Sequence, residues 1–268
     1  MLVCNVSMVP RRAALLADLA EAASADDAPT TGTVFAALVD DPASALDNCD
    51  AYFGAIMAEA ANAADNFDAT IGLITTVTWN PSDKSANIVL TSGNLTAAIS
   101  AAGDNGVRAT TSRTSGKFYF ELTSDTSTTG NGADTGIGIG TSTAGLTTVG
   151  SNALNACLAY LDGGSCYYNG GPSAKTLGGS IVAGGQVCVA IDLDNKRIWM
   201  RLNASAWWND GAANPVTNTN GLDISSLFTS NAAYPLVSCN STTPHLTANF
   251  GATTFAQTMP SGFAAWQS

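Results

Sequence analysis

The chain has 268 residues, of which 46% are hydrophobic and 12% are charged, a composition that allows a large core and excludes a disordered chain. Ten Lys and Arg residues against twenty-one Asp and Glu residues give a net charge of -11, which disfavours nucleic acid and anionic membrane as partners. The scarcity of charge among many small polar residues is typical of a surface that neighbouring subunits cover, or of a secreted β-protein.

The first ten residues, MLVCNVSMVP, are mainly apolar but do not form a membrane segment. Arg11 and Arg12 follow the apolar run, whereas a signal peptide carries its positive charge before it, and the run is too short to cross a bilayer. We interpret the run as an ordered N-terminal arm and expect no membrane insertion.

Two alanine-rich stretches before residue 76 have helical spacing. In the first, residues 11–25, Leu15 and Leu19 lie on one side of the predicted helix, and Pro29 and Gly32 follow as helix breakers. The second stretch begins near Pro42, which suits the first turn of a helix. Its apolar residues recur at steps of three and four: Leu46, Cys49, Phe53, Ile56, Met57 and Ala60.

These helices carry one narrow apolar stripe, which cannot form a core by itself and must be buried against something else. We therefore predict that residues 1–75 are a helical segment for docking into a larger assembly or for oligomerisation, with copies of the chain in a bundle such as a trimer. The alternative is a helix folded back onto the following domain. The predicted docking residues are Leu15, Leu19, Phe35, Leu46, Phe53, Ile56 and Met57.

From Thr78 onward, short apolar runs are separated by clusters of Gly, Asn, Asp, Ser and Thr, which predicts a mainly β domain over residues 76–268. Many short strands without helical periodicity between them are typical of a sandwich or a barrel. In VCVAIDLDNKRIWM, residues 187–200, alternating residues form two strands, and Asp194 and Asn195 form the turn of a hairpin. Asn195 is expected at a positive φ, because asparagine tolerates that conformation.

The six cysteines are expected to be buried thiols. They have no CxxC spacing and the chain has one histidine, so the sequence indicates no zinc site. Disulfide bonds are the alternative, which assembly inside a cell disfavours because that compartment is reducing. The cysteines are Cys4, Cys49, Cys157, Cys166, Cys188 and Cys239.

No motif for catalysis or cofactor binding is convincing, and we expect a non-enzymatic protein without cofactor or metal. Asp192 and Asp194 have the spacing of two carboxylates on one strand face, but the turn position of Asp194 favours a hydrogen-bonded structural role. His245 has no GxSxG motif beside it, which favours a solvated loop residue. GIGIG, residues 136–140, continues a strand and lacks the spacing of a dinucleotide site. The acidic loops lack the EF-hand spacing for calcium.

Four aromatic residues, Tyr167, Tyr168, Trp207 and Trp208, lie next to segments rich in glycine and asparagine, and Asn209 follows the last of them. Aromatic faces beside amide groups are suited to stacking on sugars or to packing against another protein. We favour packing of these aromatic rings within the protein. The alternative is a contact surface formed by the five residues.

Several stretches follow one another as the strands of a SPRY domain do. They are GKFYFELT (116–123), TGIGIG (135–140), AYLDGGSCYYNGG (159–171), GGQVCVAIDLDNKRIWMRLNASAWW (184–208), YPLVSCN (234–240) and TANFGATTFAQTMPSGFAAW (247–266). Residues 76–267 therefore resemble the SPRY family, with a departure at residues 195–197, where the family usually has glycine in the turn. The resemblance implies a bent sandwich of two antiparallel sheets, which recognises proteins or peptides through loops at one edge.

A second resemblance concerns the source of the chain. TWNPSDKSANIVLTSGNLTA, residues 78–97, resembles the lead-in of SPRY-like domains in virion proteins of tailed bacteriophages, and residues 30–65 resemble the N-terminal region of phage structural proteins. This implies a virion protein that is assembled in the host bacterial cytoplasm and has other virion proteins as partners. We expect a structural component, such as a capsid decoration, fibre or tail module. The alternative is an adsorption protein that binds a host-surface glycan or protein.

Overall fold

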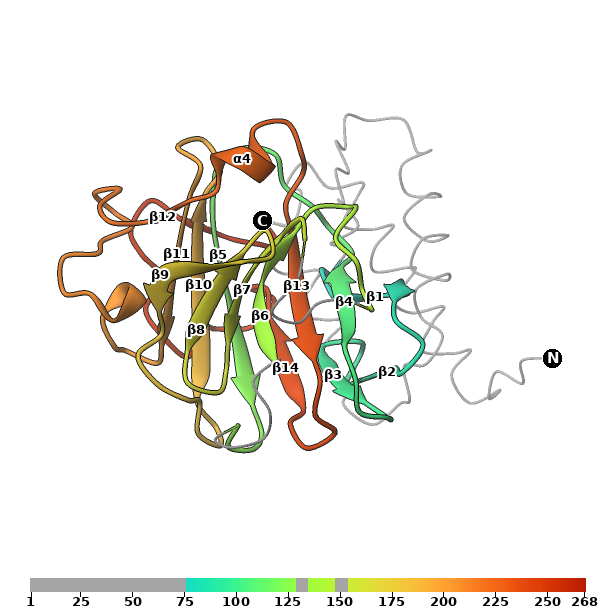
Figure 1. Cartoon of the computed structure of the whole chain (residues 1–268). Coiled ribbons are helices and arrows are strands. Elements are labelled where there is room, and N and C mark those ends of the chain that lie inside the picture. Colours follow the sequence, from blue (N-terminus) through green and yellow to red (C-terminus); the bar gives the residue numbers. More distant parts are fainter. Residues whose placement is uncertain (1–75, 129–134, 148–153) are drawn as a thin grey trace, which may run out of the picture. The chain divides into compact units, whose positions relative to one another are not determined.

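The computed structural model describes residues 76–128, 135–147 and 154–268, which belong to one compact unit, Leu73–Ser268 (Figure 1). The predicted helical segment, residues 1–75, lies outside the described residues, so its helices and its partners stay predictions. The same is true of the predicted docking residues Leu15, Leu19, Phe35, Leu46, Phe53, Ile56 and Met57.

The described residues form two antiparallel sheets, which confirms the predicted β-sandwich. One sheet has seven strands in the order β1-β4-β13-β6-β7-β8-β9, and each neighbouring pair is antiparallel. Its strands are β1 (Trp79–Lys84), β4 (Asn105–Ala109), β13 (Tyr234–Cys239), β6 (Gly136–Gly140), β7 (Ala156–Tyr160), β8 (Ser165–Tyr168) and β9 (Gly171–Thr176).

The second sheet has eight strands in the order β12-β11-β10-β5-β14-β3-β2, and β15 pairs with β5 in parallel. Its strands are β12 (Leu222–Asp223), β11 (Arg197–Leu202), β10 (Gln186–Asp192), β5 (Lys117–Ser124), β14 (Leu246–Asn249), β3 (Thr96–Ile99), β2 (Ile88–Thr91) and β15 (Ala264–Ala265). Two short helices, η2 (Trp207–Asn209) and α4 (Ser225–Phe228), lie in the connections on either side of β12.

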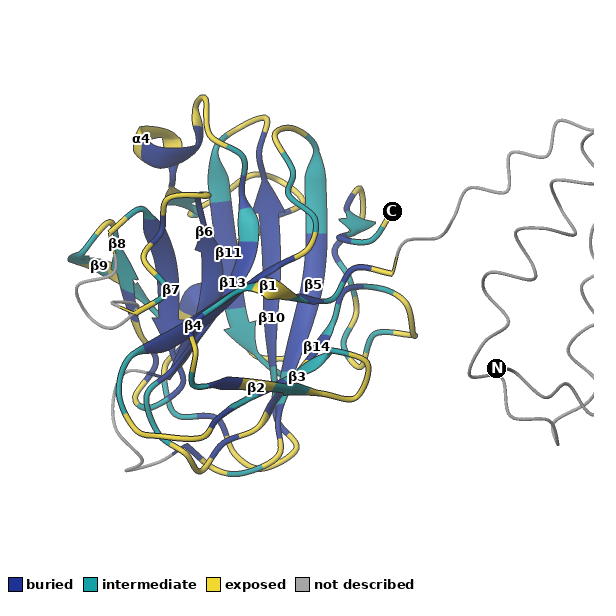
Figure 2. Cartoon of the chain, turned by 90° about the vertical axis from the view of Figure 1, so that its right-hand side faces the viewer, coloured by how far each residue is buried: buried dark blue, intermediate teal, exposed yellow. Residues whose placement is uncertain are grey.

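The main core lies between the two sheets, where Figure 2 shows the strands as buried. Alternate residues of each strand point into it, as the period of two of a β-strand requires. Large aromatic rings fill one part of this core. Trp79 meets Phe250 edge-on with ring centroids 5.1 Å apart, and Trp266 meets Phe120 in the same manner at 5.6 Å.

The predicted hairpin is present: β10 and β11 pair in antiparallel fashion, with Val189 opposite Met200. The turn differs from the prediction, because the residue at positive φ is Lys196, at 56°, and Asn195 is not. Asp192 explains the difference. Its carboxylate accepts hydrogen bonds from both the backbone and the side-chain amide of Asn195, at 2.9 and 2.7 Å, so that Asn195 is held in the first part of the turn.

Both faces of the central strands of the eight-stranded sheet are buried. The side chains that alternate with the core residues point to the outer face of this sheet, where residues 203–221 and residues 250–263 cover them. Trp199 donates from Nε1 to the carbonyl of Thr219 at 2.8 Å in the first covering loop. Buried Glu121 accepts the backbone N–H groups of Ala256 and Gln257, both at 2.8 Å, in the second loop. Strand β10 is therefore apolar on both faces.

Candidate contact surface

The five residues of the candidate contact surface do not form one surface. Tyr167 and Tyr168 are neighbours in β8, so their side chains point to opposite faces of the seven-stranded sheet. Trp207 and Trp208 belong to η2 and have exposed fractions of 9% and 2%. Asn209 ends the same helix and is exposed. The five residues therefore do not share one exposed face, and each is described separately below.

Trp207 and Trp208 pack in the protein, as the favoured interpretation expected, and do not form an exposed contact surface. The indole of Trp208 donates from Nε1 to the carbonyl of Ile198 at 2.9 Å. Helix η2 contacts β11 in one sheet and β9 in the other, so it closes the sandwich on that side. Trp207 lies under the guanidinium of Arg201, which is 4.5 Å from the ring centroid. Buried rings cannot stack on a sugar or on a second protein.

Asn209, the last residue of η2, also packs against the seven-stranded sheet side of the sandwich, near Gly178. Trp208 and Asn209 both have a positive φ, 52° and 50°, which is uncommon for residues with a side chain. The Asn209 side chain lies against Gly178, and a Cβ at position 178 would be 2.4 Å from its Cγ. Asn209 is therefore positioned to pack on the loop that follows β9.

Tyr168 connects β8 to α4 through hydrogen bonds of its hydroxyl. Its ring packs against the main core, and its hydroxyl forms a hydrogen bond of 2.6 Å with the hydroxyl of Ser226 and accepts the N–H of Leu227 at 3.1 Å. Partial burial is the main cause that raises the pKa of Tyr168 above its ordinary value. The hydroxyl is thus occupied within the chain, which assigns Tyr168 a structural contact.

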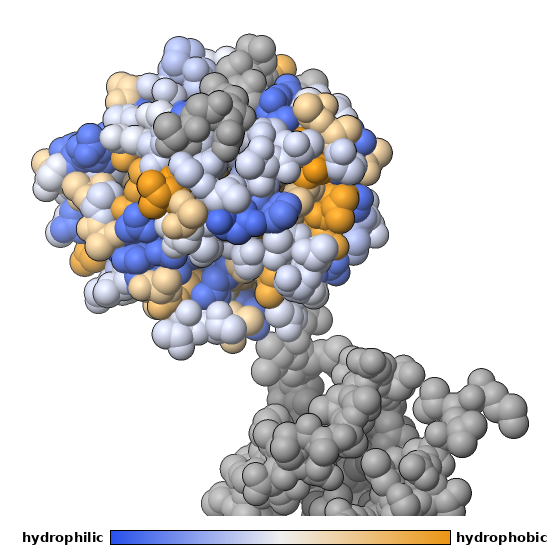
Figure 3. Space-filling view, turned by 90° about the horizontal axis from the view of Figure 1, so that it is seen from below, coloured by the Kyte–Doolittle hydropathy of each residue, from blue (hydrophilic) through white to orange (hydrophobic). Residues whose placement is uncertain are grey.

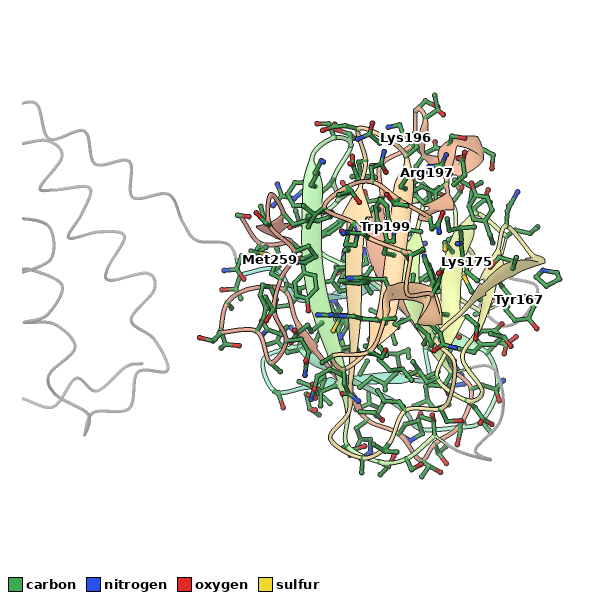
Figure 4. The ribbon with its side chains drawn as sticks, turned by 90° about the vertical axis from the view of Figure 1, so that its left-hand side faces the viewer. Tyr167, Lys175, Lys196, Arg197, Trp199 and Met259 are labelled. Atoms are coloured by element: carbon green, nitrogen blue, oxygen red, sulfur yellow. The ribbon has the colours of Figure 1, made fainter. Side chains whose placement is uncertain are left out.

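Tyr167 is the residue of the five that belongs to an outward-facing apolar group. It is half-buried, and its ring lies on that of buried Tyr160 with centroids 4.8 Å apart and an interplanar angle of 34°. Figure 4 shows Tyr167 at the periphery of the sandwich, away from Trp199. We call the group to which it belongs the outer cluster: Ala144, Leu146, Ala156, Leu158, Tyr160, Tyr167 and Leu236.

The outer cluster lies on the face of the seven-stranded sheet that points away from the main core. In β7, Leu158 and Tyr160 belong to the outer cluster, whereas their neighbours Cys157 and Ala159 belong to the main core. Leu158 pairs with Tyr167 across β7 and β8. The cluster is therefore a second apolar layer on the outside of the sandwich.

Glycines of β6 form the floor of the outer cluster. The strand GIGIG was predicted as a strand and not as a dinucleotide site, and the strand is confirmed. Gly136 and Gly140 face the outer cluster. A Cβ at Gly136 would be 2.8 Å from the Tyr160 ring, and one at Gly140 would be 2.9 Å from Leu236. Sequence reasoning missed this role, although the alternation of glycine with isoleucine was a signal of it.

A buried arginine fixes the loop at the rim of the outer cluster. Arg108 in β4 lies opposite Leu236 of β13 and has an exposed fraction of 7%. Its guanidinium donates two hydrogen bonds to the carboxylate of Asp83, each of 2.7 Å, and a third of 2.6 Å to the carbonyl of Ala144. Residues 141–147 are therefore held at a defined place beside Leu236.

The carboxylates of the described residues are satisfied within the chain, because each Asp and Glu accepts a hydrogen bond or forms an ion pair. Buried Asp192 has the hydrogen-bonded role that we expected. Burial opposes its ionisation, but hydrogen bonds from Asn195 and Lys117 outweigh burial and lower the pKa of Asp192. His245 lies in a loop with its side chain 53% exposed and pairs with Asp125 at 2.6 Å.

The described residues contain no group of three or more side chains suited to holding a metal ion. None of the helices in this part of the chain has the length and hydrophobicity that crossing a bilayer requires. Figure 3 shows that, on the end of the sandwich seen from below, hydrophobic patches are small and separated by hydrophilic residues.

Comparison with known proteins identifies the fold. No family model matches the chain, and no curated sequence matches it. Among solved structures, the SPRY domain of human HERC1 is similar, with a TM-score of 0.51 and 15% identity over 66% of this chain and 99% of that domain. A human SPRY domain and the TRIM65 PSpry domain have TM-scores of 0.42 and 0.46 and identities of 12% and 11%. They cover 63% and 65% of this chain, and 98% and 91% of their own chains. The sandwich has a SPRY-like fold.

Proposed function

We propose that the chain is a non-enzymatic, protein-binding component of a tailed-bacteriophage particle, and that its SPRY-like sandwich binds another protein through the outer cluster. The observation that carries the proposal is the half-buried Tyr167 ring within an apolar layer on the outside of the seven-stranded sheet. A rigid ring that is already packed on one side loses little conformational entropy when a partner covers the other side.

The two outer faces of the sandwich support this choice. On the eight-stranded sheet, residues 203–221 and 250–263 cover the face and satisfy its buried polar groups. On the seven-stranded sheet, Tyr167 stays partly open next to exposed Pro172, with which it pairs across β8 and β9. The chain's own loops therefore cover the outer face of the eight-stranded sheet, whereas Leu146 and Tyr167 of the outer cluster stay partly exposed.

Charge is divided unequally along the chain. Residues 1–75 contain two arginines and eleven Asp and Glu residues, a net charge of -9 out of the total of -11. Residues 76–268 carry little net charge, and the carboxylates that the structure describes there are occupied internally. This division supports two separate tasks, in which the N-terminal segment docks the chain and the sandwich recognises its partner by shape and apolar contact.

The assignment to a phage particle rests on the resemblance of residues 78–97 and 30–65 to phage virion proteins. It is tested by mass spectrometry of purified particles from the bacteriophage that encodes the chain. The proposal requires the chain in intact particles at a fixed ratio to a known structural protein. A chain that is produced during infection but missing from washed particles would refute it.

The contact surface is tested separately, with particles that lack the chain and with added full-length variants. Replacing Tyr167→Ala is expected to weaken rebinding about tenfold or more, because a buried aromatic anchor contributes at least that much. Val216→Ala is the matched control, because Val216 is 50% exposed and lies in the loop 203–221. Equal rebinding by both variants contradicts the proposal. If Tyr167→Ala instead loses binding to host-envelope carbohydrate while rebinding to particles is unchanged, the adsorption alternative is favoured.

A further inference from the structure

Two free cysteines lie side by side beneath the outer cluster. Cys157 in β7 and Cys166 in β8 are buried, with exposed fractions of 0% and 1%. Cys157 pairs with Tyr168, and Ala159 pairs with Cys166, so the two cysteines are diagonal neighbours across adjacent strands. Both belong to the main core. They therefore share the inner face of the sheet, directly behind the Leu158–Tyr167 pair.

The two thiols are neighbours across β7 and β8 and differ in pKa. A hydrogen bond between the thiols raises the pKa of Cys157 and lowers the pKa of Cys166, and Cys166 receives a further stabilising hydrogen bond from Ser173. Cys188 and Cys239 differ, because burial raises their pKa values, that of Cys239 to about 12. Cys166 lies in β8, next to the edge strand β9, and has a partner thiol beside it, so we take it as the thiol that an oxidant reaches first.

We propose that Cys157 and Cys166 are a redox-responsive dithiol that closes to a disulfide bond and covalently joins β7 to β8 behind the outer cluster. Hydrogen peroxide is the oxidant. The Cys166 thiolate attacks one peroxide oxygen, the O–O bond breaks, and Cys166 sulfenic acid and hydroxide form. The Cys157 sulfur then attacks the sulfenic sulfur and displaces the oxygen, which leaves as water after taking up a proton. Two thiols and one peroxide thus give one disulfide and two waters.

Access to the pair comes from the edge of the sheet. Strand β9 is the outermost strand and pairs only with β8, and exposed Pro172 lies within it. In this proposal, local opening of β9 exposes Cys166 at the margin of the main core. Diagonal neighbours in a sheet lie about 7–8 Å apart, somewhat beyond the usual Cα separation of a disulfide, so β8 must shift for the bond to close. A strand next to the sheet edge resists such a shift less than a central strand does.

The timing of oxidation rests on the proposed function, because a virion is assembled in a reducing cytoplasm and encounters oxidants after release. In that setting the open dithiol permits folding and assembly, and the disulfide then holds the two strands that carry Tyr167 and Leu158. The chemistry of the pair does not depend on that setting. A test on the purified chain therefore separates failure of this inference from failure of the proposed function.

The test uses the full-length chain with Cys4→Ser and Cys49→Ser, which leaves four cysteines. After treatment with hydrogen peroxide, denaturation and alkylation, we expect peptide mapping to show one cross-link between Cys157 and Cys166. Cys188 and Cys239 should be alkylated as in the reduced sample. The thermal unfolding midpoint should rise by about 5 °C and return after reduction. Full alkylation of all four cysteines, a cross-link through Cys188 or Cys239, or an unchanged midpoint would each overturn the inference.

A variant separates the two steps. In Cys157→Ala, oxidation should stop at Cys166 sulfenic acid, which dimedone traps and mass spectrometry detects. In Cys239→Ala, which removes a buried thiol of the same core, the cross-link should form as before. Dimedone labelling at Cys188 in place of Cys166 would contradict the assignment of Cys166 as the nucleophile.

Discussion

Arg108 binds the carboxylate of Asp83 through two hydrogen bonds of 2.7 Å, and the same guanidinium holds the carbonyl of Ala144 at 2.6 Å. One buried cation thereby links β4, the edge strand β1 and the loop at the rim of the outer cluster. The loop is placed by this contact and not by its own conformational preference, since Thr141 and Ala144 lie in an irregular segment.

Replacing Arg108→Ala is expected to destabilise the protein by about 3 kcal/mol, because it removes one partner of a largely buried ion pair and leaves buried carbonyls unpaired. Urea unfolding followed by tryptophan fluorescence measures the effect. Arg108→Lys keeps the charge but not the two-pronged contact, so it should lie between the wild type and Arg108→Ala. A loss smaller than about 0.5 kcal/mol for Arg108→Ala, the range of ordinary surface changes, would contradict this role.

The second prediction concerns Gly140 of β6, which lies beneath the outer cluster. Gly140→Ala should destabilise the protein by about 1–3 kcal/mol, because the new methyl group would press on Leu236 and Ala144, which a Cβ would approach to 2.9 and 3.0 Å. Gly179→Ala is the matched control, because a Cβ there meets nothing within 4 Å. Thermal unfolding of both variants under one condition decides the matter. Equal midpoints would show that the floor tolerates a side chain.

The hairpin turn makes a third prediction. Lys196 has a φ of 56°, which favours glycine, so Lys196→Gly should be more stable than Lys196→Ala by about 0.5–1 kcal/mol. The comparison with Lys196→Ala removes the effect of the lost charge. Chemical denaturation of the two variants measures the difference. If Lys196→Ala were the more stable, backbone strain at this position would not be the governing factor.

Asp192 makes stability depend on acid pH. Hydrogen bonds hold its folded pKa below the ordinary value of 3.8, so its carboxylate stabilises the fold fully above that value. The contribution is lost as pH falls below 3.8 through the folded pKa, because the unfolded chain binds the proton first. The stability difference between the wild type and Asp192→Asn should therefore shrink between about pH 5 and about pH 2. A constant difference across that range would show that ionisation of Asp192 is irrelevant.

The division of the chain near residue 75 predicts that a fragment of residues 76–268 folds by itself. Its strands and its core come from within that range. Circular dichroism should show β-structure, and size-exclusion chromatography should show a monomer. Residues 1–75 alone should associate or stay unfolded, because one apolar stripe cannot form a core. An aggregating fragment from residue 76 would place the boundary elsewhere.

Local patterns were sufficient for several predictions. The period of two in residues 187–200 predicted the β10–β11 hairpin, and GIGIG predicted β6, because strand alternation is a local property of the backbone. Asp192 was correctly expected to have a hydrogen-bonded role, since its nearest partners lie in the adjacent turn. The SPRY-like fold could be expected from the order of such strands along the chain.

The contact surface could not be predicted in the same way. Tyr167, Tyr168 and Trp208 look alike in sequence, as aromatic residues beside glycine and asparagine. Their environments differ because distant segments contact only some of them. Ser226 of α4 forms a hydrogen bond with the hydroxyl of Tyr168, and Trp208 donates a hydrogen bond to Ile198 while its helix η2 contacts β11 and β9. The positive φ of Lys196 could not be predicted either, because it follows from the hydrogen bonds that Asn195 donates to the carboxylate of Asp192.

The sequence by itself determined the mainly β character of the described part of residues 76–268, the β10–β11 hairpin and the alternation of residues in its strands, because these depend on neighbours along the chain. Only the tertiary structure decided which outer face is completed by the chain's own loops and which keeps an open aromatic ring. That choice depends on residues 203–221 and 250–263 returning across the eight-stranded sheet, and no local preference encodes where such a loop comes to lie.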